Sequence, residues 1–350
     1  MTLGEWAERW LGQQGHLRPK TLVGYESVVH RRLCPVLGHL PLAEIDRETV
    51  RELLAGMANN GLAPGTVREA RKVLSLVLGA AVEARLLPTN SAAGLKIARG
   101  SRTEMRFLGH AEIERLADAI AHPELRRAGH GAAPWWRAEY PELGLLVRFA
   151  GYTGLRASEL AGLRVRDLNL RDARVVVGTT LAEVSGHGLV EGPTKTAKQR
   201  SVPLPGFLVE ALTAHVAGKE PTDWVFTGPE GGPLRHHNFY LRHFLPATRQ
   251  AGLEGVRFHD LRHTCAALLI AEGAHPRAVM ERLGHSSITV TLDRYGHLFP
   301  ALEEALTASL EASRDKALAL GPQPKADEVS GTDRARPART LVRRTPTKPA

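Results

Sequence analysis

Apolar residues recur at helical spacing through the first 95 positions of the chain. Leu3, Trp6 and Trp10 share one face of a first segment, and Thr2 with Glu5 forms the Ser/Thr-x-x-Glu pattern that caps the start of a helix. Prolines at the starts of later segments and Gly or Asn-Gly at their ends set further boundaries. The pattern predicts a small bundle of four short helices, at about residues 3–11, 19–37, 50–59 and 64–87.

The pattern becomes mixed after Phe107. A β-branched run covers residues 173–180, and two more strand candidates, around 189–190 and 201–204, flank the sequence GPTKT. These two strands are expected to pair as a small antiparallel sheet with Lys195 near its turn. Helices are expected at about residues 110–121, 143–152, 157–166, 206–217, 236–250, 259–272, 275–283, 286–297 and 300–314. The predicted fold is two domains, an N-terminal all-α bundle and a C-terminal α+β domain with a small antiparallel sheet.

Composition places the domain boundaries. The stretch KIARGSRTEMR has four basic residues, one acid and little apolar content, which favours an exposed linker. The segment HPELRRAGHGAAPWWRAEYP, residues 122–141, is expected to be an irregular insertion. Residues 316–350 hold eight basic and three acidic side chains and five prolines. Such a segment has too little apolar surface to bury, so it is expected to be disordered. The predicted organisation is a helical domain at 1–95, a linker at 96–106, a larger domain at 107–314 and a disordered basic tail at 315–350.

Charge and cysteine content narrow the class of protein. The 350 residues carry a formal net charge of +9, which favours a polyanionic partner such as nucleic acid, although the tail contributes much of that charge. Only Cys34 and Cys265 are present, far apart, which excludes a disulfide-stapled secreted scaffold. No apolar stretch approaches the roughly 20 residues needed to cross a bilayer, and no signal peptide is evident. We expect a cytoplasmic protein with no membrane partner.

Two motifs open helices with residues suited to phosphate chemistry. In TGLRASEL, Arg156 and Glu159 stand at i,i+3, so a guanidinium can fork onto phosphate oxygens while the carboxylate fixes its rotamer. Alone, such a pair is more often a surface ion pair. In FHDLRHT, His259 and Arg262 share a face at a helix N-terminus, which attracts anions. Alone, the histidine is more often a cap.

Metal binding is a rival interpretation of the second motif, since His259 and His263 stand at i,i+4. A zincin needs Glu directly after the first histidine, yet Asp260 stands there and no third ligand is evident. A third motif carries Gly-His-Ser at 284–286 and Tyr295 ten residues after His285. Each motif alone fits a surface ion pair or a helix cap. Their order along the chain favours a catalytic site instead: Arg, Lys between strands, His-x-x-Arg, Gly-His-Ser, then Tyr.

The set TGLRASEL, PTKTAKQRSVPLP, HDLRHTCAALLIAEGAHPRAVMERLGHSS and DRYGH resembles the tyrosine recombinase (phage integrase) family, with five motifs in the family's order and approximate spacing. The stretch RPKTLVGYESVVHRRLCPVLG is similar to that family's helical core-binding (SAM-like) domain. The resemblance covers nearly all of residues 1–314 and implies a two-domain clamp around duplex DNA. It also implies a metal-independent enzyme with no cofactor.

The resemblance implies roles for individual residues. Tyr295 is the nucleophile, which forms a 3′-phosphotyrosyl bond and frees a 5′-hydroxyl. Arg156 and Arg262 clamp the phosphate oxygens, His259 handles the tyrosine proton, and His285 hydrogen-bonds the phosphate. Lys195 protonates the leaving 5′-oxygen, with Lys198 as the alternative, and Glu159 supports Arg156. Further DNA contacts are expected from Arg18, Lys20, Lys96, Arg99, Arg102, Arg106, Lys198 and Arg200.

These features predict a DNA strand transferase, an integrase of a prophage or other mobile element. Its expected partners are double-stranded DNA with inverted-repeat core sites, other copies of itself in a synaptic tetramer, and an accessory DNA-bending or directionality factor. Chromosome-dimer resolution or inversion would use the same chemistry. A catalytically silent DNA-binding protein and a zinc hydrolase are the alternatives from other classes.

Overall fold

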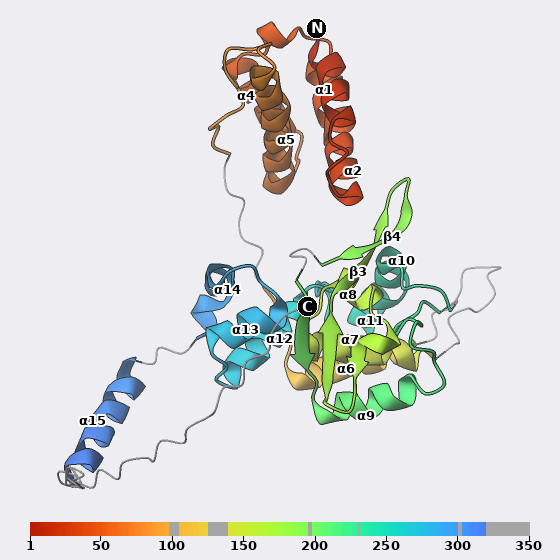
Figure 1. The fold of residues 1–350 in the computed structure, drawn as a ribbon, viewed down its shortest axis with the longest axis vertical. Coiled ribbons are helices and arrows are strands. Elements are labelled where there is room, and N and C mark those ends of the chain that lie inside the picture. The colour runs from red at the N-terminus through yellow and green to blue at the C-terminus, as the bar shows by residue number, and fades with distance from the viewer. Residues whose placement is uncertain (98–104, 125–138, 195–197, 230, 300–302, 320–350) are drawn as a thin grey trace, which may run out of the picture. The chain divides into compact units, whose positions relative to one another are not determined.

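The computed structural model describes residues 1–97, 105–124, 139–194, 198–229, 231–299 and 303–319 (Figure 1). The predictions that concern Lys195, Arg99, Arg102, most of the insertion at 122–141 and residues 320–350 therefore lie outside the described residues. None of the described helices is long and apolar enough to span a membrane.

The N-terminal part is a bundle around one long helix, α5. Thr2 caps α1 as predicted, because its side chain accepts from the backbone N–H of Glu5 while Glu5 returns a bond to the Thr2 backbone. The Trp6 indole N–H donates to the carbonyl of Val77 in α5 over 2.9 Å. The elements are α1 (Leu3–Gly12), α2 (Pro19–Val28), η1 (Val29–Leu33), α3 (Cys34–Leu37), η2 (Leu42–Glu44), α4 (Arg47–Asn59) and α5 (Pro64–Glu83).

The C-terminal part has a core of its own, built around α7 (Pro141–Thr153). Helix α7 packs against α6 (His110–Ala121) on one side and α12 (Asp260–Ala271) on another. Buried residues of these helices join those of the strands in one apolar cluster, which includes Leu116, Phe149 and Val175. The remaining helices are α8 (Ala157–Ala161), η4 (Val165–Asp167), α9 (Gly206–His215), α10 (His236–Phe239), η5 (Tyr240–Phe244), α11 (Leu245–Gln250), α13 (Pro276–Leu283), α14 (Ile288–Tyr295) and η6 (Gly296–Leu298).

Two helical runs widen into a π-helix just before a proline. Pro35 follows η1 by two positions, and Pro246 follows η5 in the same way. A proline inside a helix has no N–H to donate, and its ring crowds the carbonyl four residues earlier. The wider turn relieves this conflict, so the predicted helices at 19–37 and 236–250 continue through their prolines instead of breaking.

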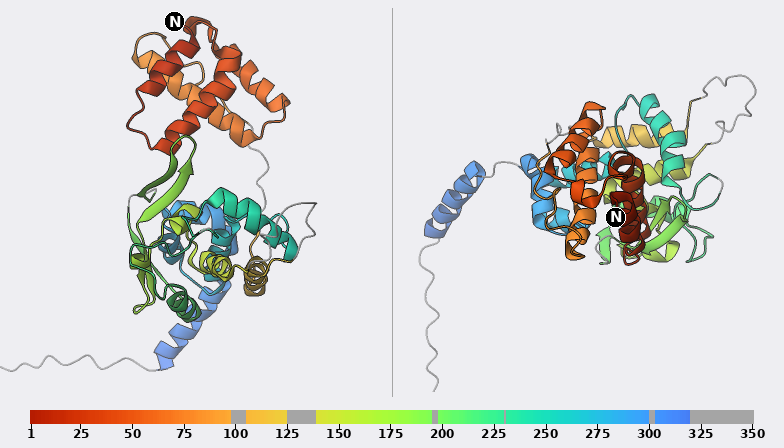
Figure 2. Two further views of the ribbon diagram at one scale, coloured as in Figure 1. Left: turned by 90° about the vertical axis from the view of Figure 1, so that its right-hand side faces the viewer. Right: turned by 90° about the horizontal axis from the view of Figure 1, so that it is seen from above.

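The strand prediction was right in position and wrong in pairing. The run at 173–180 divides at Gly178 into β2 (Arg174–Val177) and β3 (Thr179–Val184), and the halves take different partners. β4 (Gly188–Pro193) pairs with β3, while β5 (Arg200–Pro203) pairs with β2, which also pairs with β1 (Leu168–Asn169). The strands on either side of GPTKT therefore belong to two sheets. The β3–β4 hairpin projects from the body of its domain (Figure 2).

The helix ends that differ most from prediction are those of α8 and α15. Helix α8 ends at Ala161 instead of near residue 166, because the backbone of Gly162 lies against β3: a Cβ there would stand 2.8 Å from the Leu181 nitrogen. Helix α15 (Glu303–Ala319) extends beyond the expected end at Arg314. Lys316, Ala317 and Leu318 are strong helix formers, so the start of the predicted tail is helical.

Gly154 ends α7 in a left-handed conformation, with φ of 69°, and has no room for a side chain. An added Cβ would lie 2.5 Å from Leu283 Cδ2 and 3.1 Å from Cys265 Sγ. Its carbonyl also accepts a hydrogen bond from Arg262. This residue therefore joins α7, α12 and the end of α13 at one point.

We expect Gly154→Ala to lower the free energy of unfolding by about 2–4 kcal/mol, from backbone strain together with overpacking. Gly186→Ala is the matched control, because Gly186 has φ of 76° but open space around it, so only the backbone cost of about 1 kcal/mol applies. Scanning calorimetry measures both. Equal losses in the two variants would contradict the packing argument.

Candidate active site

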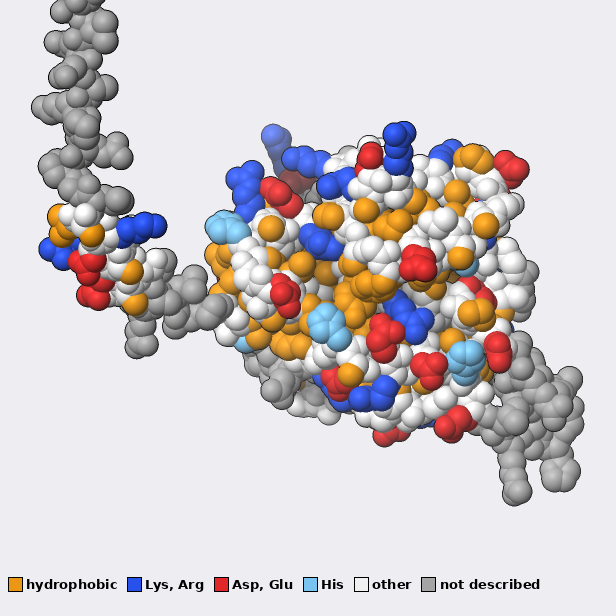
Figure 3. Space-filling model, turned by 90° about the horizontal axis from the view of Figure 1, so that it is seen from below, with side chains coloured by type: hydrophobic (Ala, Val, Ile, Leu, Met, Phe, Trp, Pro, Cys, Tyr) orange, Lys and Arg blue, Asp and Glu red, His pale blue; other side chains and the backbone are white. Residues whose placement is uncertain are grey.

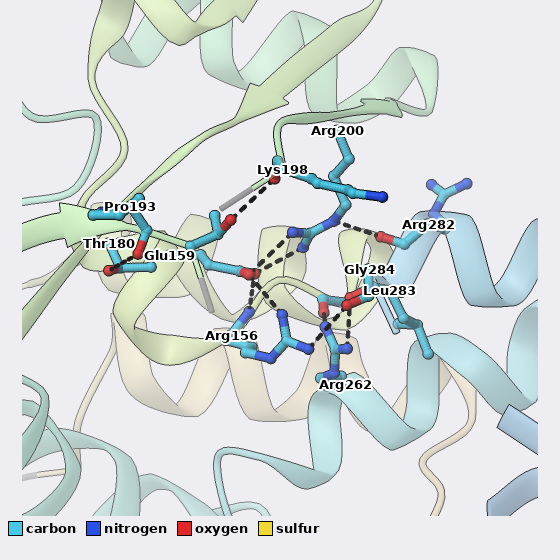
Figure 4. A network of polar contacts seen from close by, with 12 residues as sticks. Arg156, Glu159, Thr180, Pro193, Lys198, Arg200, Arg262, Arg282, Leu283 and Gly284 are labelled. Carbon is cyan, nitrogen blue, oxygen red and sulfur yellow. Dashed lines mark hydrogen bonds and ion pairs between the residues drawn. The ribbon is translucent and has the colours of Figure 1, made fainter. Parts of the chain in front are cut away.

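The site is built around the buried carboxylate of Glu159, which is 1% exposed. Glu159 lies in the first turn of α8, three positions after the N-cap residue Arg156. The left-handed Gly154 stands two positions before Arg156. The Arg156 backbone N–H and its Nη1 both donate to this carboxylate, each over 2.8 Å. Arg156 Nη2 donates to the carbonyl of Gly284 over 3.2 Å. The short turn between α7 and α8 thus aims Arg156 across the site (Figure 4).

Arg200 binds the same carboxylate from β5. Its Nη1 and Nη2 donate to the two oxygens of Glu159 over 3.0 and 2.7 Å, and its Nε donates to the carbonyl of Arg282 (Figure 4). Burial alone would raise the pKa of Glu159, but the hydrogen bonds and charges of Arg200 and then Arg156 lower it to about 2. Arg200 was expected to contact DNA. Its guanidinium is instead turned inward onto Glu159, with the side chain 12% exposed.

Arg262 lies deeper, on the first turn of α12, and is 3% exposed. Its Nη1 donates to the Gly154 carbonyl and its Nη2 to the Leu283 carbonyl, each over 2.6 Å. Burial and then the positive charge of Arg156 lower its pKa. The two guanidiniums thus lie close enough to repel each other, and a bound anion would relieve that repulsion.

Tyr295 ends α14 and is fully buried. Its Oη lies 2.7 Å from Nδ1 of His263. The His285 ring lies nearly parallel to the phenol ring, with centroids 6.4 Å apart. Burial raises the pKa of the Tyr295 phenol, so the hydroxyl is protonated near neutral pH.

The other two histidines differ in environment. His285 follows Gly284, and its Nδ1 lies 2.8 Å from Oγ1 of the buried Thr291 in α14. His259 is the N-cap residue of α12 and is exposed, with its ring edge-on to that of His263 at 5.0 Å between centroids. Burial, followed by the charges of Arg262 and Arg156, lowers the pKa of His285 to about 3.

The structure brings together Arg156, Glu159, Arg262, His285 and Tyr295 from four separate motifs, with His259 at the rim. Of the residues expected to touch DNA, five are described and exposed: Arg18, Lys20, Lys96, Arg106 and Lys198. Arg106 donates to the carbonyl of Glu254. Among the described residues, no group of three or more His, Cys, Asp or Glu could hold a metal ion, and His259 and His263 gain no third ligand.

Three residues of the site were missed or given another role by the sequence analysis. His263 was considered only as a metal ligand, Thr291 had no role, and Arg200 was expected on the surface. The position of His263 directly after Arg262 was a signal that could have placed it near the site. Nothing local to Arg200 or Thr291 indicates their contacts, which come from distant parts of the chain.

The chain belongs to the phage integrase family. The model described as "Phage integrase family" matches residues 106–301, and "Phage integrase, N-terminal SAM-like domain" matches residues 2–58. The integrase of Mycobacterium phage FRAT1 is 28% identical over 295 residues, 82% of this chain and 81% of that protein. A XerC-like tyrosine recombinase of Caldanaerobacter subterraneus subsp. tengcongensis is 26% identical over 332 residues, 86% of this chain and 80% of the relative.

Solved structures share the fold. The Tn1549 transposon integrase in complex with a circular intermediate DNA superposes with a TM-score of 0.74 at 20% identity, covering 89% of this chain and 99% of that one. A lambda integrase dimer bound to a COC′ core site gives a TM-score of 0.61 at 22% identity, covering 83% and 97%. The chain is a tyrosine recombinase family enzyme, with a helical SAM-like domain and a catalytic domain of helices and small antiparallel sheets.

We expect Glu159→Gln to lower the free energy of unfolding by about 3 kcal/mol, because it leaves two arginine charges in a buried site without their counter-charge. Glu281→Gln is the control, since the Arg277–Glu281 pair is exposed and worth less than about 1 kcal/mol. Urea denaturation compares the two variants. A loss in Glu159→Gln no larger than in the control would show that the carboxylate does not hold the site together.

We also expect stability to fall as the pH drops below about 6.5. Burial, followed by the charge of His259, lowers the pKa of His263 to about 4, and that of His285 is lowered to about 3. A histidine whose pKa is lower when folded takes up its proton first in the unfolded chain, so acid favours unfolding between about pH 6.5 and pH 4. Glu159 adds its own loss only below about pH 4.5.

Thermal melts between pH 8 and pH 5 at constant ionic strength measure this dependence. His285→Asn should flatten it, because one of the responsible groups is then absent. A melting temperature that stays constant or rises on acidification would contradict the prediction.

Proposed function

We propose that this protein is a site-specific recombinase that cleaves and rejoins duplex DNA through a 3′-phosphotyrosyl intermediate. The observation that carries the proposal is the convergence of Tyr295, Arg156, Arg262 and His285 in one cluster of side chains in the catalytic domain. A phosphodiester is anionic and a poor electrophile, so fixed cationic donors are what its cleavage requires.

In the proposed reaction, Tyr295 Oη attacks phosphorus as the bond to the 5′-oxygen breaks. Arg156 and Arg262 bind the non-bridging oxygens and offset the charge that develops in the transition state. Each guanidinium has five N–H donors, and the bonds to carbonyls and, for Arg156, to the Glu159 carboxylate use two of them, which leaves donors for phosphate. The phosphotyrosine conserves the bond energy, so a 5′-hydroxyl can rejoin the strand without an external energy source.

Proton transfer completes the scheme. A histidine in the first turns of α12 takes the phenol proton, the role that family resemblance gives to His259. Lys195 protonates the leaving 5′-oxygen, with the exposed Lys198 as the alternative. His285 donates to the phosphate through the ring nitrogen that is not bonded to Thr291.

The buried phenol implies a movement on binding. A duplex phosphate cannot reach a side chain with no exposed surface, so α14 has to shift for attack. Only two side chains of α14, Thr291 and Tyr295, are buried, and Ile288 and Leu292 are exposed. Few packing contacts therefore oppose the shift.

DNA recognition is proposed to extend beyond this pocket. The exposed basic residues Arg18, Lys20, Lys96 and Lys198 contribute contacts to the phosphate backbone, as do Arg99 and Arg102. The face in Figure 3 carries charges of both signs scattered among apolar side chains, which does not suit a DNA backbone. Arg106 contributes a backbone contact as well. We propose that the DNA carries inverted-repeat core sites and that the protein acts on it as a synaptic tetramer.

The biological role we propose is an integrase of a prophage or other mobile element, acting in the cytoplasm. The integrases of Mycobacterium phages among its relatives support this role. The XerC-like relatives favour chromosome-dimer resolution as the second candidate. An accessory DNA-bending or directionality factor fits either role. We propose domain boundaries at 1–95, 96–106 and 107–314. The matched range 106–301 begins beside the proposed start of the larger domain, whereas the matched range 2–58 covers only the first part of the helical domain.

We expect Tyr295→Phe to bind DNA normally and to form no covalent complex, since it lacks the attacking oxygen. A duplex selected from a random-sequence library by binding to the Tyr295→Phe chain supplies the substrate, nicked near the cleavage point to trap the intermediate. Denaturing gels then measure covalent complex for the wild type. Tyr140→Phe is the control, and a covalent band of normal yield from Tyr295→Phe would refute the assignment.

The same assay tests the two alternative functions. Full activity of the wild type in excess chelator excludes a zinc hydrolase, and no activity of the wild type at all favours a silent DNA-binding protein.

Arg156→Ala and Arg262→Lys should slow cleavage far more than they weaken binding, because each side chain touches one phosphate among many. The loss of one charge-assisted contact in the transition state is worth roughly 3 kcal/mol, about a hundredfold in rate. Single-turnover cleavage and gel-shift titrations on the selected duplex separate the two effects. Arg277→Ala, on an exposed helix face, should change neither; equal losses in binding and cleavage would mean that the two site arginines only hold DNA.

A further inference from the structure

His263 contacts the nucleophile directly. Its Nδ1 lies 2.7 Å from Tyr295 Oη, and the two residues are 6% and 0% exposed. His259, which the family motif points to, is exposed and meets the His263 ring edge-on. The hydrogen-bond partner of the phenol in the structure is therefore the second histidine of HDLRH and not the first.

We propose that His263 is a catalytic residue of this enzyme: it accepts the Tyr295 phenolic proton during strand cleavage and returns it during rejoining, which leaves His259 to contact the DNA phosphate. This inference rests on the proposed function, because it assigns one proton transfer within that reaction. It also requires that the Oη–Nδ1 contact is kept when α14 shifts to admit the phosphate.

The surroundings favour an imidazole that is neutral before the reaction. The charged and titratable groups near it are His259, Asp260 and Arg257 from the start of α12 and the turn before it, and Arg294, Tyr295 and His285 from α14 and the segment before it. Burial and the neighbouring His259 lower the pKa of His263 to about 4. A neutral ring has one nitrogen free to accept, and a protonated phenol is the donor that Nδ1 faces.

The step balances with groups already in the scheme. The proton moves from Oη to Nδ1 as the Oη–phosphorus bond forms and the phosphorus–O5′ bond breaks, and Lys195 supplies a separate proton to the 5′-oxygen. On rejoining, the 5′-hydroxyl attacks and gives its proton back to Lys195, the phenolate leaves, and His263 returns the proton to it. The phosphodiester anion beside Tyr295 favours the protonated imidazole, so bound DNA raises the pKa of His263 above its value in the free chain and lets the ring hold the proton between the two steps.

Two variants test the proposal on the full chain with the selected duplex. His263→Asn and His263→Gln should bind that duplex like the wild type and cleave it about a hundredfold or more slowly, the range for loss of a general base. His237→Asn, an exposed histidine of α10, is the matched control and should cleave normally. A wild-type rate in the His263 variants refutes the proposal, and so does a faster rate, which would mean that His263 only keeps Tyr295 buried.

A second substrate shows whether the His263 variants impair proton removal from the phenol or proton donation to the leaving 5′-oxygen. In a duplex with sulfur in place of the leaving 5′-oxygen, the leaving group needs no acid, so the Lys195→Ala defect should disappear while the His263 defect remains. Recovery of the His263 variants on this duplex would assign His263 to the leaving group and overturn the proposal. If the wild type forms no covalent complex on either duplex, the proposed function itself fails.

The contact can also be tested without a variant of His263. Nitrogen NMR of the wild-type chain should show the His263 Nδ1 without a hydrogen, and Tyr295→Phe should shift that signal. A hydrogen on Nδ1 would make the imidazole the donor to the phenol, contrary to the proposal, even if the His263 variants fail to fold.

Discussion

The buried carboxylate of Glu159 is the group on which the rest of the site depends. It has almost no contact with solvent, yet it stays ionised because Arg200 and Arg156 donate to it from two different elements. Removing a carboxylate from water is costly unless its lone pairs are filled by such donors. These two ion pairs also depend on the fold, since β5 and α8 must be correctly placed before both arginines can contact Glu159. The geometry of Arg156 is therefore a consequence of the folded domain as a whole.

Helix ends supply the second constraint. Helices α7 and α13 each end in a left-handed glycine, Gly154 and Gly284, and the last carbonyls of a helix lack partners within it. Arg262 fills two of these acceptors and Arg156 a third. Cations near helix C-termini also interact favourably with the helix dipole. The arginines proposed to bind phosphate are thus held in place before any DNA arrives.

Local patterns along the chain predict much of the secondary structure and many of the site residues. Apolar spacing and capping signals predict the helices of both domains, the capping box at Thr2 among them, and the order of the motifs identifies Arg156, Arg262, His285 and Tyr295 as a set. Prediction was weaker where the outcome depends on distant partners. The strands beside GPTKT were placed well but paired wrongly, because alternation within a strand does not say which neighbour it joins. Roles for Lys195 and His259 remain predictions.

The sequence by itself determined the family, the helical segments and the residue types of the site, since these depend on spacing within short windows of chain. Only the tertiary structure decided that Arg200 faces Glu159 and that the Tyr295 hydroxyl meets His263. Those contacts join residues 41 and 32 positions apart, across separate helices and strands. The partners are fixed by how α8 packs against β5 and how α12 packs against α14, and packing of distant elements is a property of the whole core that no local pattern records.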